Sequence, residues 1–258
     1  MFRRIRILVL LYVLAFVAAG SWLSRARVTD WDTSLWVDVY PINGDGSQQA
    51  QRYIDMLSER DFEPVEQFLQ SQASAYAIHL DLPADLKLAP QVHQFPPTLA
   101  ANAGIWQSAV WSLKMRWWSK KVARDLDRPS PDIQVFAIYF SDRSKVSLDR
   151  STALEKGRVA VANLFANRRL RGSNQVVLSH ELLHTLGATD KYQPGTNLPL
   201  FPAGYGDPNA VPRYPQRYAE LMGGRIAITQ NQAKIPDSLA EVKVGPLTAA
   251  EIGWLAGD

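Results

Sequence analysis

Two histidines four residues apart, His180 and His184, constrain this chain more than any other feature of its sequence. Gly187 follows them, and glycine is typical of the end of a helix because it accepts a left-handed backbone. Ser173 and Asn174 are good N-caps, so the pattern predicts a helix that begins near them and ends at Gly187. On such a helix the two imidazoles share one face and can converge on a single metal ion.

The composition narrows the kind of metal site that these histidines can form. The chain has no cysteine, so thiolate ligands are excluded and any zinc must be held by nitrogen and oxygen. Asp190 can complete the set, because Gly187 lets the chain turn back toward the ion. Three protein ligands leave one position for water, and Glu181 lies beside the first histidine, where it can act as general base in hydrolysis.

The segment 180–190 reads His-Glu-x-x-His-x-x-Gly-x-x-Asp and resembles the extended zinc signature of the metzincin metallopeptidases. The Asp-ending form is similar to that of the snapalysin-type secreted bacterial proteases, and Glu-Leu-Met-Gly-Gly at 220–224 resembles their methionine turn. The resemblance implies one catalytic Zn²⁺ ion, a zinc-bound water and the following roles: ligands His180, His184 and Asp190, general base Glu181, and Met222 at the base beneath the metal. The resemblance is confined to these two motifs and says little about residues 28–127.

Two parts of the site stay open in the sequence. Glu220 is an alternative third ligand, as in thermolysin-like enzymes, although Pro215 and the glycines at 223–224 leave little room for the helix that such a ligand needs. A tyrosine can also hydrogen-bond the tetrahedral intermediate. The candidates are Tyr192 and Tyr218, with Tyr205 and Tyr214 in the same proline-rich loop.

The N-terminus predicts a membrane anchor. Basic residues at 3, 4 and 6 precede an uncharged apolar run from residue 7 to about 23, and no clean cleavage site follows. We therefore expect residues 1–27 to form a signal anchor or transmembrane helix, with the N-terminus in the cytoplasm. Residues 28–258 are then expected on the outer side of the inner (cytoplasmic) membrane, in the periplasm or outside the cell.

The rest of the chain predicts an α/β (α+β) domain with a mixed twisted sheet, a long backing helix and the metal-binding helix. Its upper part, 28–187, ends with the metal-binding helix, and its lower part is 188–258. We expect strands at 35–40, 132–140 and 156–165. We expect helices at 47–60, 63–77 and 98–126. A further short helix is expected to open with a capping box at 248–251 and to run to residue 255. Residues 82–97 are expected as a connector or short strand, and 192–218 as a long ordered loop.

The helix expected over 98–126 carries four tryptophans among basic residues. Such a helix near an anchor is compatible with a membrane surface. The stripe Trp106, Val110, Leu113 and Trp117 favours the other interpretation, in which these residues pack beneath the sheet.

These features predict a membrane-anchored zinc metallopeptidase that hydrolyses peptide bonds. The net charge of +3, without a long basic block, argues against nucleic acid as a partner. An extended peptide is expected to add to the strand at 159–165, in the manner of the edge strand of metzincins. Two alternatives remain: a zinc hydrolase of cell-wall amides, and a zinc-site binding or scaffold protein without turnover.

Overall fold

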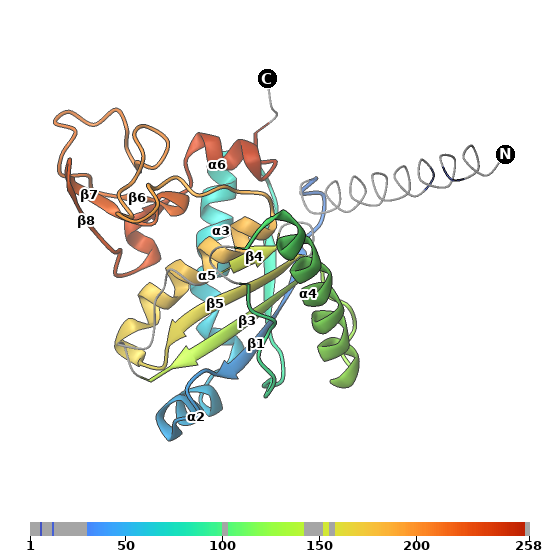
Figure 1. Ribbon diagram of the computed structural model, residues 1–258. Coiled ribbons are helices and arrows are strands. Elements are labelled where there is room, and N and C mark those ends of the chain that lie inside the picture. The colour runs from blue at the N-terminus through green and yellow to red at the C-terminus, as the bar shows by residue number, and fades with distance from the viewer. Residues whose placement is uncertain are drawn as a thin grey trace.

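A five-stranded sheet forms the centre of the computed structural model, which describes residues 30–99, 103–141, 152–154 and 158–255, together with Arg6 and Tyr12 (Figure 1). The strands are β1 (Leu35–Asn43), β2 (Ala84–Leu88), β3 (Ile133–Phe140), β4 (Thr152–Leu154) and β5 (Val159–Phe165). Their order is β2-β1-β3-β5-β4. The first four of these run parallel, whereas β4 pairs antiparallel with β5. The sheet is therefore mixed, as predicted.

The order of the strands corrects one expectation about the substrate. Strand β5 lies between β3 and β4, and β4 is the last strand in the order. The register pairs Thr152 with Val161 and Leu154 with Val159. Strand β4, which the sequence did not predict, therefore covers residues 159–161 of the strand that was expected to bind the substrate.

The described residues also form five α-helices. They are α2 (Gln48–Asp55), α3 (Glu63–Ala75), α4 (Ile105–Asp125), α5 (Arg171–Thr185) and α6 (Pro246–Glu251). Short 3₁₀ helices lie at Glu59–Asp61, Arg168–Leu170, Leu221–Gly223 and Leu239–Glu241. Each helix and strand predicted within residues 28–258 is present, with shifted ends, and residues 82–97 contain the short strand β2.

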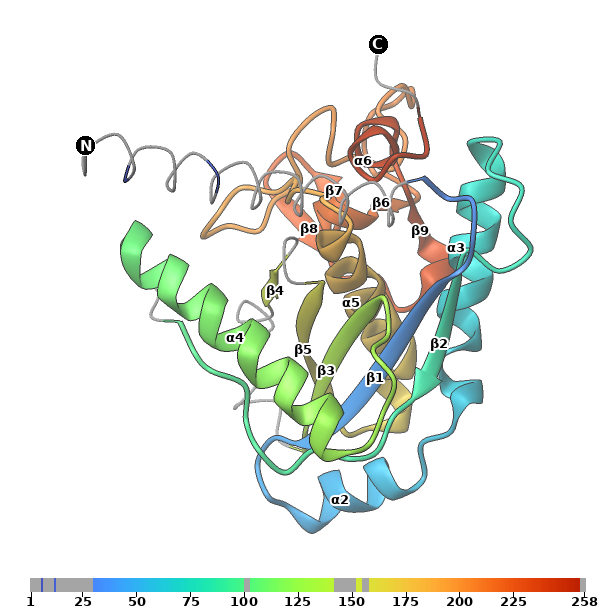
Figure 2. The ribbon, with the colours of Figure 1, turned by 90° about the vertical axis from the view of Figure 1, so that its right-hand side faces the viewer.

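The sheet separates two hydrophobic cores, because successive side chains of a strand point to opposite faces. On one face, Val135 and Ala137 of β3 pack with α2, α3 and α5. On the other face, Phe136 and Ile138 pack with α4. Figures 1 and 2 show α4 on one side of the sheet and α3 with α5 on the other. Both faces are covered, as is usual for a parallel sheet.

The orientation of α4 contradicts the expected packing. Its buried face consists of Trp111, Met115, Trp118 and Val122, whereas the predicted stripe of Trp106, Val110, Leu113 and Trp117 is exposed. Both sets have the spacing i, i+4, i+7 and i+11, so periodicity alone could not decide between them. An α-helix turns by about 100° per residue, so the two stripes lie about 140° apart around the helix. The helix is apolar on two opposite faces.

The first turn of α5 differs from the prediction. The helix begins at Arg171 after Leu170, which provides no side-chain cap. Asn174, predicted as an N-cap, instead accepts a hydrogen bond from the backbone nitrogen of Phe165 at 2.9 Å and donates one to its carbonyl oxygen at 2.8 Å. Its amide thus extends the backbone pairing of β5 and fixes α5 against the sheet.

The last helix also begins earlier than predicted. Helix α6 opens at Pro246, with Gly245 as N-cap, and proline suits this first turn because it lacks the amide hydrogen. Thr248, expected as the cap, is buried inside the helix and donates a hydrogen bond to Glu220 at 2.6 Å. The capping box at 248–251 was therefore a wrong prediction.

The lower part of the domain is mostly loop. Residues 192–218, all of them described, contain no helix or strand, as predicted, but two isolated bridges, Tyr192 with Pro199 and Tyr205 with Ala219, tie the loop down. Two small ladders follow: β6 (Ala219–Glu220) with β9 (Val242–Lys243), and β7 (Ile226–Thr229) with β8 (Gln232–Lys234).

The predicted anchor at 1–27 lies outside the described residues, apart from Arg6 and Tyr12. Of the helices in the described part of the chain, none combines the length and the apolar character that a membrane crossing requires.

Candidate metal centre

The C-terminal end of α5 sets the direction of the second histidine. Gly187 has a φ of +106°, and the chain reverses through two hydrogen bonds, from Gly187 to the His184 carbonyl and from Ala188 to the Leu183 carbonyl. This is a Schellman motif, in which glycine is favoured at the residue of positive φ. The predicted role of Gly187 is confirmed. The carbonyl oxygen of Ala188, brought back by the reversal, accepts a hydrogen bond from His184 Nδ1 at 2.8 Å.

Both histidines direct the same ring atom into the site. His180 Nδ1 donates to the carbonyl oxygen of Leu221 at 2.9 Å, and His184 Nδ1 donates to that of Ala188. A carbonyl oxygen can only accept, so both Nδ1 atoms carry the hydrogen and each neutral imidazole presents a lone pair at Nε2. Metal-binding histidines are commonly oriented in this way.

Three acceptor atoms converge at this point. The two Nε2 atoms lie 3.0 Å apart, and Asp190 Oδ1 lies 3.1 Å from Nε2 of His180 and 3.0 Å from Nε2 of His184. Lone pairs that meet so closely require a shared proton or a cation between them. His180, His184 and Asp190 are thus a group that could hold a metal ion, and its nitrogen and oxygen atoms fit zinc.

The electrostatics of the group also favour a positive charge. Burial raises the pKa of Asp190, but the adjacent imidazoles of His180 and His184 outweigh burial and hold this pKa well below its usual range. For His180 burial lowers the pKa, yet the adjacent carboxylate of Asp190 and the charge of Glu181 outweigh burial and raise this pKa above its ordinary value. The carboxylate is therefore kept ionised, and the site around it stabilises a cation.

Glu181 is the unsatisfied group of this centre. Its side chain is buried, and its Oε2 has no hydrogen-bond partner among the described residues. Burial raises the pKa of Glu181, while the neighbouring imidazoles of His180 and His184 act to lower it. A buried carboxylate without a partner is costly to stability. It is typical of sites that hold or transfer a proton or face a cation.

The turn at residues 221–222 is hydrogen-bonded to both ligand segments. The Leu221 carbonyl accepts from His180, and the Met222 carbonyl accepts from the backbone nitrogen of Lys191 at 2.8 Å. Met222 itself is fully buried in the same core as α5. The residue predicted for a methionine turn thus lies in a turn that positions one histidine and the residue after Asp190.

An ion pair fixes the loop that carries Asp190. Lys191 is buried, and its ammonium group donates to Glu251 Oε2 at 2.7 Å and to the Thr189 carbonyl at 2.9 Å. Thr189 donates a further hydrogen bond to Glu251 at 2.6 Å. Burial raises the pKa of Glu251, but the hydrogen bonds from Lys191 and Thr189 outweigh burial and lower it. Helix α6 thereby holds the residues on both sides of Asp190.

The structure does not bring the alternative ligand Glu220 into the group. Its carboxylate is fully buried and accepts hydrogen bonds from Gly223 at 2.9 Å, Gly245 at 3.0 Å and Thr248 at 2.6 Å. These bonds close the turn at 221–223 and connect it to α6. Glu220 is therefore a structural residue here, and Asp190 is the carboxylate that lies with the histidines.

The four candidate tyrosines lie in different surroundings. The Tyr192 ring is 6.4 Å from the His180 ring, centroid to centroid, with 30° between their planes. The Tyr218 ring lies under the Lys243 ammonium group at 4.2 Å, and the Tyr205 and Tyr214 hydroxyls hydrogen-bond each other at 2.9 Å. Of the four, Tyr192 is the one whose ring lies beside a residue of the candidate metal site.

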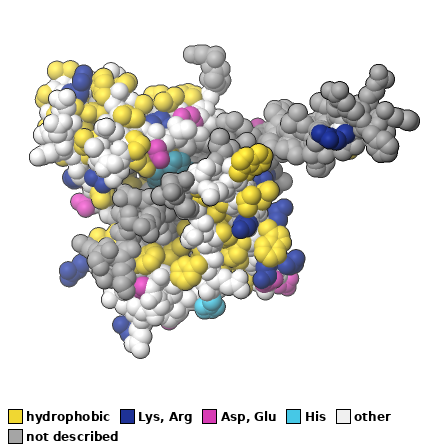
Figure 3. Space-filling model, viewed as in Figure 1, with side chains coloured by type: hydrophobic (Ala, Val, Ile, Leu, Met, Phe, Trp, Pro, Cys, Tyr) yellow, Lys and Arg dark blue, Asp and Glu magenta, His cyan; other side chains and the backbone are white. Residues whose placement is uncertain are grey.

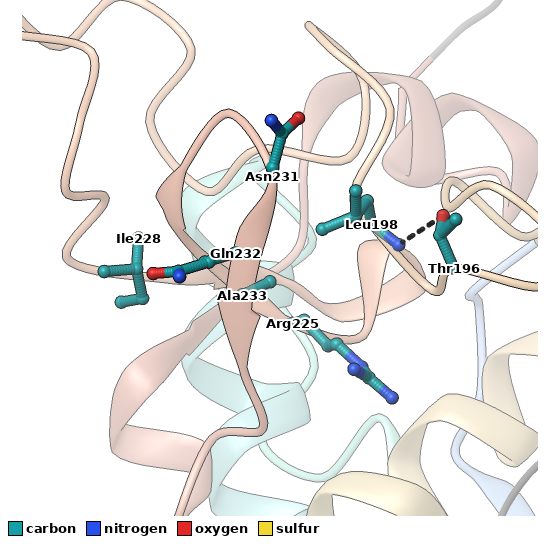
Figure 4. A pocket seen from close by; sticks show the side chains of 7 residues that line it. All are labelled: Thr196, Leu198, Arg225, Ile228, Asn231, Gln232 and Ala233. Atoms are coloured by element: carbon teal, nitrogen blue, oxygen red, sulfur yellow. Dashed lines mark hydrogen bonds between the residues drawn. The ribbon is translucent and has the colours of Figure 1, made fainter.

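A groove adjoins the turn on the side of the small ladder β7–β8 (Figure 4). It is lined by Thr196, Leu198, Arg225, Ile228, Asn231, Gln232 and Ala233. Arg225 follows directly on Gly224, so the groove begins where the turn ends. Its lining combines one cation with amide, hydroxyl and aliphatic side chains.

Sequence reasoning missed the groups that orient the ligands. The groups at Ala188 and Leu221 are backbone carbonyls, whose role does not depend on the type of side chain. Only the three-dimensional arrangement shows that they orient the histidines. The ion pair between Lys191 and Glu251 joins residues 60 positions apart, so no local sequence pattern predicts it.

Comparisons with known proteins add little to this geometry. The chain matches no family model, and no curated protein sequence matches it. Among solved structures it is similar to OgpA from Akkermansia muciniphila, with 14% sequence identity and a TM-score of 0.41. The match covers 85% of this chain, which spans 59% of the OgpA chain.

Proposed function

We propose that this chain is a zinc-dependent peptidase in which His180, His184 and Asp190 hold the ion and Glu181 is the general base. The observation that supports this most directly is the convergence of two Nε2 atoms and one carboxylate oxygen within about hydrogen-bonding distance of one another. Both Nδ1 atoms are already used by carbonyl oxygens, so the Nε2 lone pairs remain for a metal. The likeness to the metzincin signature makes peptide the proposed substrate class.

The zinc ion and Glu181 would have separate chemical roles in hydrolysis. Zinc, when bound, would supply a Lewis acid that polarises the scissile carbonyl and acidifies water. Glu181 takes the proton of the attacking water and returns it to the leaving amine, which a buried carboxylate with a free oxygen can do. A structural metal site needs no such base, so Glu181 favours turnover over a scaffold role.

We place an extended substrate along β4. This strand is last in the order of the sheet and antiparallel to β5, and β5 leads through Arg168–Leu170 into the metal-binding helix α5. Addition of a strand to an open sheet edge supplies backbone hydrogen bonds whatever the peptide sequence. The anchor proposed at 1–27 would keep this activity outside the cytoplasm, at the membrane.

Metal removal tests the proposal. Full-length protein treated with ortho-phenanthroline should lose cleavage of a peptide library down to background, and added Zn²⁺ should restore it. The non-chelating meta isomer is the matched control and should have no effect. Peptide cleavage that persists without metal would contradict the proposal. Zinc-bound protein that cleaves cell-wall amides but no peptide would favour the alternative hydrolase.

Tyr192 is the proposed donor to the oxyanion, because its ring lies beside that of His180. Tyr192→Phe should lower kcat by about 10²–10³-fold with little change in KM, the range found when one oxyanion donor is removed. Tyr218→Phe should have the smaller effect, since the Tyr218 ring faces Lys243. Steady-state kinetics of the two variants decide between them, and the reverse order would assign the role to Tyr218.

A further inference from the structure

A second surface of the molecule has no role in hydrolysis: the outer face of α4. Trp106, Val110, Leu113 and Trp117 form one line along this helix, and their side chains are 85%, 49%, 66% and 68% exposed. The opposite face of the same helix supplies the packing against the sheet. The stability of the fold therefore does not explain why these four positions are apolar.

The four side chains form a contiguous stripe rather than scattered exceptions. Positions 106, 110, 113 and 117 fall within about 60° of one another around the helix, at about 100° per residue. Single exposed apolar residues are ordinary on protein surfaces, but a contiguous stripe with two tryptophans marks a surface that contacts something else. Tryptophan in particular is enriched where apolar and aqueous phases meet, because its ring is apolar and its N–H is polar.

Positive charge surrounds the stripe. Helix α4 contains five basic residues and one acidic residue, Asp125. Lys114, Lys120 and Arg124 are exposed, and Lys121 is partly exposed. At the same rotation per residue, Arg124 continues the line of the stripe, while Lys120 and Lys121 lie on its two sides. Figure 3 shows apolar side chains with basic ones among them over the part of the surface formed by α4.

We propose that this outer face of α4 binds the surface of a bilayer that contains anionic phospholipid. An apolar stripe with aromatic residues, flanked by Lys and Arg, is the pattern of helices that lie in the plane of the interface. The basic residues meet the phosphate headgroups, and the four apolar side chains enter the acyl boundary. A second copy of the chain fits this face poorly, because pairing through it would bring two sets of positive charges together.

The absence of cysteine from the sequence makes a direct test possible. Val110→Cys in the full-length chain carries a single nitroxide label on the stripe. Gln67→Cys is the matched control: Gln67 is exposed on α3, and α3 covers the other face of the sheet. Each labelled protein is reconstituted into vesicles of phosphatidylcholine alone, or of phosphatidylcholine with phosphatidylglycerol. Collisions of the label with dissolved oxygen and with a water-soluble nickel chelate report its depth.

The proposal predicts a severalfold rise in the ratio of oxygen to nickel collisions at position 110 in the mixed vesicles, and a smaller rise in phosphatidylcholine alone. The label at position 67 should stay aqueous in both. Adding Trp106→Ser and Trp117→Ser should return the label at 110 to water. Adding Lys120→Gln, Lys121→Gln and Arg124→Gln should remove the difference between the two lipids. Unchanged thermal unfolding of these surface variants checks that the fold is intact.

Three outcomes would overturn the proposal. The label at 110 could remain as aqueous as the label at 67 in the mixed vesicles. It could show spin–spin broadening that is independent of lipid, which would indicate contact with a second copy. It could also be shielded from both reagents in both lipids, which would indicate that a protein segment covers the stripe. None of these results depends on whether the chain hydrolyses peptides.

Discussion

Replacing Glu181 by glutamine should leave zinc bound and lower kcat for peptide cleavage by about 10²–10⁴-fold, the usual contribution of a positioned general base. Glutamine has the same shape, so the buried pocket around residue 181 stays filled, but the amide cannot take a proton from water. Glu181 already lacks a hydrogen-bond partner at Oε2 within the described part of the chain. The substitution therefore breaks no hydrogen bond of Oε2 with the described residues.

The measurement is metal content together with kcat and KM on one cleaved peptide. Glu63→Gln is the matched control, since Glu63 is an exposed glutamate in the first turn of α3, and it should cleave at the native rate. Full activity of Glu181→Gln would refute the mechanism. Loss of zinc from this variant would instead show that Glu181 is a ligand.

The second large effect concerns Asp190. Asp190→Ala should weaken zinc binding by more than about 100-fold, because even partners that only orient a metal ligand contribute 10–100-fold to affinity. The variant keeps the two imidazoles but loses the oxygen that lies 3.0 Å and 3.1 Å from their Nε2 atoms. Zinc should then remain on the native protein and leave the variant during dialysis against a competing chelator.

Thermal unfolding gives an independent measure of this loss. A ligand that binds only the folded state at 100 times its Kd stabilises it by about 2.7 kcal/mol, so a 100-fold weaker site loses most of that gain. Asp207→Ala is the control, because Asp207 is an exposed aspartate in the following loop. Full zinc occupancy in Asp190→Ala, equal to that in Asp207→Ala, would show that Asp190 is not the third ligand.

The sequence predicted the local geometry of the candidate site well, since that geometry depends on short spacings. A separation of four residues determines which face of a helix His180 and His184 share, and Gly187 adopts the positive φ that its place after the helix requires. The placement of Asp190 beside the two histidines followed from the same turn. Each of these inferences spans fewer than about a dozen residues, where backbone geometry alone restricts what can meet.

Longer-range features could not be predicted in this way. Helix α4 offers two apolar stripes of identical spacing, and only the sheet decides which one is buried. Asn174 and Thr248 have the side chains of helix caps, yet tertiary partners, Phe165 and Glu220, use them instead. Strand β4 is three residues long, too short for periodicity to reveal.

The turn at residues 221–222 has a consequence for how the site is assembled. It accepts one hydrogen bond from His180, 41 positions earlier in the chain, and another from Lys191, the neighbour of Asp190. The turn thus helps to hold the three candidate ligand atoms in place. We therefore expect any affinity for an ion to depend on the assembled domain, because an isolated peptide of residues 171–190 would first have to order its own histidines and aspartate.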